Sequence, residues 1–203
     1  MEEKRVRLVF TEMVLGTASG NPELHREYIA SKSPSAKTIE EEVQALGPDA
    51  VEKKEMTVFP RDEEGRPFLY DYQIKGFFKN ACKAMREVPD SQSAKLKAYK
   101  TKIDNLVFVD ERKIRFNAPD GGEVEIGNLQ RPLRASTAQG ERIALANSES
   151  VPAGTEVEFT IKCLDPKLMP IVEEWLDYGE LNGIGQWHNS GMGRFVWYDL
   201  GEK

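Results

Sequence analysis

Apolar and polar residues alternate along several short segments of the chain, which is the pattern of β-strands with one buried face. Near the start, the side chains of Val6, Leu8 and Phe10 fall on the same face of an extended chain. Other segments alternate in the same manner or are short apolar runs bounded by turn residues. The pattern predicts four principal strands, at residues 5–14, 106–109, 155–163 and 194–199.

Two further segments have apolar residues at intervals of three and four, the spacing of a helix that buries one face. In the first segment, Ile74, Phe77 and Phe78 share a face. In the second segment, Ile171 and Trp175 share a face. The predicted helices span residues 71–88 and 167–178.

Along the chain these elements follow the order β-α-β-β-α-β, which is the order of the ferredoxin-like split unit. The sequence therefore predicts an α+β fold, with a ferredoxin-like (RRM-like) sheet that carries its helices on one face. Residues 1–203 are expected to form a single domain, with two large insertions at about 15–70 and 110–154. Within the second insertion, residues 130–149 are predicted to be mostly loop.

The composition is that of a globular protein, since 39% of the 203 residues are hydrophobic and 31% are charged. No apolar run approaches the ~20 residues of a membrane span, and the N-terminus lacks the apolar core of a signal peptide. The two cysteines are too few for a disulfide framework or a zinc site. We therefore expect a cytoplasmic protein that makes no membrane contact and needs no metal or other cofactor.

The net charge of −6 is unevenly distributed along the chain. Between Lys75 and Arg142 basic residues outnumber acidic ones, whereas the rest of the chain is strongly acidic. Such segregation predicts a local basic surface on an acidic protein. The alternative, which charge alone leaves open, is a solvated surface with uneven patches.

Four glycines lie within eleven residues, between the second predicted helix and the last predicted strand. They form two Gly-apolar-Gly groups, Gly183-Ile184-Gly185 and Gly191-Met192-Gly193, separated by five residues. Glycine accepts positive φ and lets a backbone approach a ligand closely. The segment, which we call the glycine loop (residues 183–193), therefore predicts a shaped turn whose exposed amides can bind an anion.

The glycine loop resembles the G-h-G-x(5)-G-h-G signature of the RAMP (repeat-associated mysterious protein) superfamily, the RNA-binding proteins of CRISPR systems. That superfamily also places its loop between the second helix and the fourth strand of a ferredoxin-like fold. The segment from Pro67 to Lys79, which contains Ile74-Lys75-Gly76, looks like the segment leading into the first helix of CRISPR effector backbone subunits. One departure is that the gap between the glycine pairs usually holds Lys or Arg. Here only His188 in the gap can become cationic, and Arg194 follows the loop.

The resemblance implies a protein that binds single-stranded RNA or CRISPR RNA without cutting it, with other RAMP subunits or copies of itself as further partners. Arginine side chains suit phosphate contacts, and Trp187 is expected to stack on a base. The residues expected to bind RNA are Gly183, Gly185, Gln186, Trp187, His188, Asn189, Gly191, Gly193, Arg194, Lys75, Lys79, Arg131, Arg134 and Arg142.

Two other functions compete with this interpretation. Some RAMP proteins cut CRISPR repeat RNA without a metal, and histidine suits both proton transfers near neutral pH. His25, with Tyr28 nearby, lies roughly where that branch has its catalytic histidine, although a surface or capping histidine is the structural alternative. The third hypothesis is an acidic RAMP mimic, encoded by a phage for example, that inhibits a CRISPR or other defence complex or acts as its adaptor. The net charge of −6 favours this hypothesis.

Overall fold

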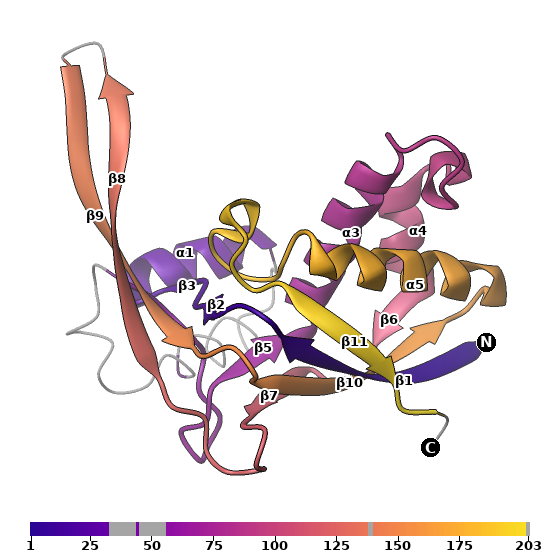
Figure 1. Ribbon diagram of the computed structural model, residues 1–203, viewed down its shortest axis with the longest axis horizontal. Coiled ribbons are helices and arrows are strands. Elements are labelled where there is room, and N and C mark those ends of the chain that lie inside the picture. The colour runs from indigo at the N-terminus through magenta and orange to yellow at the C-terminus, as the bar shows by residue number, and fades with distance from the viewer. Residues whose placement is uncertain (33–43, 45–55, 138–139, 202–203) are drawn as a thin grey trace.

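The main sheet has six strands in a computed structural model that describes residues 1–32, 44, 56–137 and 140–201 (Figure 1). In sequence order they are β1 (Glu2–Phe10), β5 (Phe68–Tyr70), β6 (Val107–Val109), β7 (Lys113–Asn117), β10 (Glu156–Cys163) and β11 (Phe195–Asp199). They lie in the order β11-β1-β10-β7-β5, and β6 pairs with the C-terminal end of β10. Each of these pairings is antiparallel.

Helices cover one face of this sheet, as Figure 1 shows for α3 (Asp71–Met85), α4 (Tyr99–Leu106) and α5 (Met169–Asp177). Their apolar faces are buried, and the rings of Phe78 and Trp175 pack with centroids 5.7 Å apart. The strands contribute alternate side chains, such as Leu8 and Phe159, to the same core. The predicted α+β class is confirmed, and β1, α3, β6, β10, α5 and β11 follow one another in the predicted order.

The opposite face of the sheet is polar because the remaining residues of β1 and β10 point to it. Arg5 and Arg7 pair with Glu158 at 2.8 and 2.7 Å. Lys162 pairs with Asp110 at 2.8 Å. Acidic and basic groups therefore alternate over this face instead of forming a basic surface.

A second sheet of five strands continues from the end of β1. Its strands are β2 (Val14–Leu15), β3 (Ala18–Ser19), β4 (Met56–Val58), β8 (Gly127–Thr137) and β9 (Gly140–Val151). The order is β2-β9-β4-β3, and β8 pairs with β9 alone. Helix α1 (Pro22–Lys32) follows β3 and is capped by Asn21, whose Oδ1 accepts the amide of Glu23 at 3.0 Å. Residues 33–43 and 45–55 of the first expected insertion lie outside the described residues.

The prediction of a loop at residues 130–149 was wrong, because these residues form most of the hairpin β8–β9. The hairpin rises well away from the rest of the molecule (Figure 1). Its strand β8 contains Pro132 directly opposite Leu145. A strand with one unpaired side tolerates proline, so the turn-forming residues did not prevent pairing here.

Buried Glu149 connects the hairpin to the segment that enters the main sheet. Its side chain is only 3% exposed, and its carboxylate accepts the amide of Phe59 at 2.9 Å. Arg61 pairs with the other carboxylate oxygen at 2.8 Å. A buried carboxylate needs such partners, and these contacts fix residues 59–61 beside β9.

Candidate functional site

The glycine loop connects the single turn η4 (Tyr178–Glu180) after α5 to strand β11 and contains one further turn, η5 (His188–Ser190). Its two ends meet, since the amide of Ile184 donates to the carbonyl of Gly193 at 3.0 Å. The amide of Gly193 donates to the carbonyl of Met13 at 2.8 Å. The base of the loop is therefore fastened to the segment that follows β1.

Close backbone packing explains three of the four glycines. Gly193 has a φ of +67°, and a Cβ there would collide with the carbonyl oxygen of Ile184. A Cβ at Gly183 would collide with the backbone of Met192 and Gly193. Gly185 has a φ of +98°, and a Cβ would lie 2.7 Å from a carbonyl oxygen of β2. Side chains at these positions are excluded by the fold itself.

The expectation of a loop with exposed amides is wrong at six positions. Gln186, for example, donates its amide to the carbonyl of Leu15 at 3.4 Å. The amides that donate to carbonyls of the loop or of the neighbouring segment 13–15 are those of Ile184, Gln186, Ser190, Gly191, Met192 and Gly193. Because the loop folds tightly on itself, its backbone groups satisfy one another. At these six positions the loop offers no free amide to an anion.

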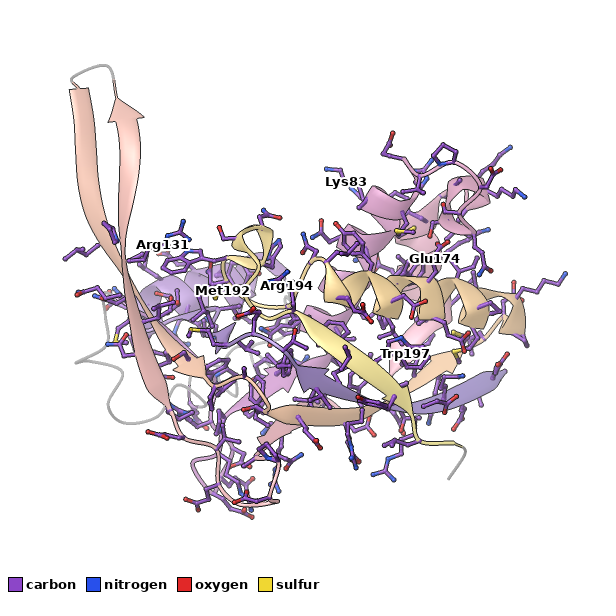
Figure 2. All side chains as sticks on the ribbon, viewed as in Figure 1. Lys83, Arg131, Glu174, Met192, Arg194 and Trp197 are labelled. Atoms are coloured by element: carbon purple, nitrogen blue, oxygen red, sulfur yellow. The ribbon has the colours of Figure 1, made fainter. Side chains whose placement is uncertain are left out.

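Arg131 of β8 reaches across to the glycine loop, as Figure 2 shows. Its guanidinium carbon lies 4.8 Å from the centre of the Trp187 ring, a cation–π contact. Its Nη1 donates to Ser190 Oγ at 3.4 Å. Trp187 has a left-handed φ of 57°, which turns the half-buried indole out of the regular backbone path. Two residues expected to bind RNA, distant in sequence, are thus brought together.

Arg194 uses much of its guanidinium within the protein. Its Nε donates to the carbonyl of Gly191 at 3.0 Å, and its Nη2 pairs with Glu12 at 3.3 Å (Figure 2). On the outer turn, Asn189 is exposed and accepts a hydrogen bond from Asn182 at 3.4 Å. These contacts hold the loop in shape, and a role of Arg194 toward RNA stays a prediction.

The other expected RNA-binding cations lie away from the loop. Lys79 pairs with Asp104 of α4 at 2.5 Å, and Lys75 donates to the carbonyl of the same residue at 3.1 Å. Burial lowers the pKa of Lys75. Arg134 and Arg142 belong to the hairpin strands, and their side chains lie outside the described part of the structure. The expected residues therefore occupy three places: the loop, the hairpin and the side of α3 that faces α4.

A cleft of about 480 Å³ opens between α1, the first turns of α3 and the glycine loop. His25 and Tyr28 of α1 line one side, Tyr72 of α3 lines another, and His188 lines the loop side. Both histidines of the chain thus face one cleft.

His25 is buried in the wall of this cleft, with only 3% of its surface exposed. Its ring stacks beside that of Tyr28 with centroids 6.5 Å apart. Its Nε2 has no hydrogen-bond partner among the described residues. Burial lowers the pKa of His25 below its ordinary value of 6.5, so the imidazole is neutral at neutral pH.

His188 is held by the loop backbone. Its Nδ1 lies 2.9 Å from the carbonyl oxygen of Gly185 and must donate, because a carbonyl only accepts. In the neutral imidazole, Nε2 is then an acceptor. The loop therefore fixes both the ring and its tautomer at the edge of the cleft.

The α3 wall of the cleft is bare at Gly76. Gln73, Gly76, Phe77 and Asn80 all line the cleft, as residues three and four apart on a helix do. Glycine inside a helix is about 1 kcal/mol less favourable than alanine. A Cβ at Gly76 would meet nothing within 4 Å, so packing within the protein gives no reason for glycine here.

Sequence reasoning missed the aromatic group at the start of α3. The rings of Tyr70 and Tyr72 stack with centroids 5.2 Å apart. The guanidinium of Arg112 lies 4.5 Å from the first ring and 5.4 Å from the second, and it donates to Asp71 at 2.5 Å. The Tyr-Asp-Tyr run was a local signal, but Arg112 arrives from the connection between β6 and β7 and had none.

Comparison with known proteins gives a likeness of fold. No protein-family model matches the chain, and no curated protein matches it in sequence. Among solved structures, the fold is similar to a chain of the type III-B Cmr-beta complex bound to cognate target RNA, with a TM-score of 0.51 and 9% identity. That match covers 98% of this chain and 60% of the other, so this chain spans 60% of that relative's length.

A chain of a type IV-B CRISPR complex is also similar, with a TM-score of 0.46 and 10% identity, covering 98% of this chain and 90% of that one.

Within residues 1–32, 44, 56–137 and 140–201, no helix has both the length and the apolar character to cross a membrane. The same ranges contain no group of three or more His, Cys, Asp or Glu side chains placed to hold a metal ion.

Proposed function

We propose that this chain is a RAMP-like, CRISPR-associated protein that binds single-stranded RNA without cutting it. The observation that carries the proposal is the contact of Arg131 with Trp187, which joins the hairpin to the glycine loop beside an aromatic-lined cleft. Single-stranded nucleic acids are bound by such combinations of cations with aromatic faces. The likeness of fold to a chain of an RNA-bound CRISPR complex supports the same function.

In this proposal the chain is one RAMP-like domain. Its insertions, at about residues 15–70 and 110–154, supply α1, which lines the cleft together with the glycine loop, and the hairpin β8–β9, whose Arg131 contacts that loop. The RNA backbone follows Arg131 and the hairpin arginines, Arg134 and Arg142. Other RAMP subunits, or further copies of this chain, extend the bound strand.

Replacement of Arg131 tests the proposal. Arg131→Ala removes a cation and its contact with Trp187, and we expect it to weaken binding of fluorescently labelled single-stranded RNA by about 10-fold in an anisotropy titration. Arg86→Ala is the matched control, because Arg86 is exposed and stacks 5.1 Å from the ring of Tyr99, away from the cleft. It should leave RNA affinity unchanged.

Two outcomes contradict this arrangement. If Arg86→Ala weakens binding as much as Arg131→Ala does, the RNA lies on the surface around Arg86 and Tyr99 instead. Absence of saturable binding by the wild-type protein at micromolar concentration and low salt would reject RNA binding. In that case, capture of a CRISPR effector complex in a pull-down experiment would support the acidic mimic.

A metal-independent endoribonuclease is the second candidate, because both histidines line one cleft. The lowered pKa of His25 keeps the imidazole neutral, which is the form that acts as a general base. With the 2′-hydroxyl as nucleophile, Tyr28 and His188 are the nearby groups for the second proton transfer. Wild-type protein should then cut repeat hairpin RNA in EDTA, and His25→Ala should not. Intact RNA after incubation with the wild type would reject this function.

A further inference from the structure

The cleft differs in chemistry from a phosphate site. It is lined by aromatic, amide and small side chains, and none of the described residues that line it is charged when its histidines are neutral. Phosphates are bound by cations and by rows of free amides. The cleft volume of about 480 Å³ lies within the range of about 300–1,000 Å³ found for small-molecule sites. Its size and neutrality therefore suit an uncharged, polar ligand group.

The walls of the cleft suit a flat ligand. At Gly76 the face of α3 is bare, and the space that a side chain would occupy there is empty. Tyr28 and Tyr72 line the cleft and remain 53% and 37% exposed. Exposed aromatic side chains beside a bare wall can hold a planar ring by stacking and van der Waals contact.

Polar groups at the cleft can read the edge of such a ring. Asn80 lies one helical turn after Gly76, and its half-buried amide can both donate and accept hydrogen bonds. His188 presents an acceptor from the loop side when its ring is neutral. An unpaired nucleobase has donors and acceptors on a planar edge.

We infer that the cleft takes one unstacked nucleobase of a bound RNA strand. The base lies against the bare helix face at Gly76, with its edge toward Asn80 and His188. Its phosphates stay outside, on the side of the glycine loop where Arg131 contacts Trp187. This inference rests on the proposed RNA-binding function and adds the position at which a base is bound.

The substitution Gly76→Leu extends a side chain into the proposed site from a position where a Cβ meets no atom. Since the Cβ meets no atom within 4 Å and leucine is a better helix former than glycine, we expect the midpoint of thermal unfolding to rise by ~2–4 °C. The matched control is Thr101→Leu, which adds the same side chain to an exposed position of α4 outside the cleft. A folded Gly76→Leu variant makes its binding defect interpretable.

Binding is then measured with two strands of equal length, a short oligouridylate and a ribose-phosphate strand that lacks bases. We expect Gly76→Leu to weaken binding of the oligouridylate by about 10-fold, the effect of losing one stacked base. It should leave binding of the base-free strand unchanged, and Thr101→Leu should change neither. An equal loss for both strands would mean that the cleft takes the backbone and would overturn the inference, although RNA binding would stand.

Free nucleotides are the other source of a nucleobase. Uridine monophosphate should compete only weakly with the oligouridylate for the wild-type protein, and inorganic phosphate should not displace it from the cleft. Tight binding of the free nucleotide without binding of RNA would overturn both the inference and the proposed function. Unchanged oligouridylate affinity in Gly76→Leu would overturn the inference alone.

Discussion

At the scale of single residues, the burial of His25 contributes to the pH dependence of stability. Burial lowers the pKa of this residue below 6.5 in the folded protein. The unfolded chain therefore binds the proton more readily, and the stability associated with His25 is present above its unfolded pKa and lost as the pH falls below it. We expect the free energy of unfolding to fall as the pH drops from about 7.5 through the unfolded pKa of 6.5, and this fall to be smaller in His25→Phe.

Urea unfolding of both proteins at several pH values measures this difference. The comparison isolates His25 because the carboxylates are the same in the two proteins. An identical pH dependence would mean that His25 does not contribute to it.

A second prediction is that the same glycine-to-alanine substitution lowers stability by different amounts at Gly193 and Gly121. Gly193 has a φ of +67° and faces the carbonyl of Ile184, whereas Gly121 has a φ of +75° and nothing within 4 Å of its missing Cβ. Gly121→Ala should lower the free energy of unfolding by about 1–2 kcal/mol, which is the cost of placing a residue with a Cβ in the left-handed conformation. Gly193→Ala should cost clearly more, because the backbone must also move. Thermal unfolding compares the two variants, and equal costs would contradict the packing explanation.

Single residues also show how far sequence reasoning reached into the site. The spacing of the glycines located the loop, but the same tight packing that demands glycine also satisfies six of its amides. The expectation of exposed amides was therefore wrong at those six positions. The contact of Arg131 with Trp187 depends on the hairpin, which local patterns did not reveal, so the residues were identified but their meeting was not.

At the scale of elements, the hairpin β8–β9 can be shortened without changing its register. Leu133 lies directly opposite Ala144, so a two-residue Asn-Gly turn can replace residues 134–143 and close the hairpin there. We expect the thermal unfolding midpoint to stay unchanged, because the rest of β9 keeps its pairing with β2 and β4.

RNA affinity should fall in the shortened protein if the hairpin arginines contact phosphates. Anisotropy titration with the same labelled RNA measures this effect. Unchanged affinity would remove Arg134 and Arg142 from the binding surface. A matched control is the full-length hairpin with Asn-Gly in place of residues 138–139, which keeps both arginines.

The elements also mark the limit of pattern reading. Strands and helices with a buried face, such as β10 and α3, follow directly from apolar spacing, because burial imposes that spacing. Along residues 127–132 strand β8 is mostly exposed, so burial imposes no such pattern there. Strand β8 is held to β9 by backbone hydrogen bonds. Because an edge strand can contain proline and arginine, its sequence resembles that of a loop.

At the scale of the whole molecule, the proposed RNA binding predicts that affinity falls as the salt concentration rises. Each phosphate contact to single-stranded RNA contributes about −0.7 to the slope of log affinity against log salt concentration. Arg131→Ala should therefore make the slope shallower by about 0.7. The slope is measured by titrations at several salt concentrations, with Arg86→Ala as control. An unchanged slope would mean that Arg131 contacts no phosphate.

The arrangement of the main sheet has a consequence for how the protein is made. Strand β1 pairs with β10 and β11, which lie far along the chain. Strand β1 is synthesised before β10 and β11, so it must wait for both of them before it acquires these neighbours. Contacts of such long sequence separation slow folding, and an unpaired strand edge invites aggregation. The sheet is thus a late product of synthesis, and shielding of β1 by chaperones matters most before residue 195 emerges.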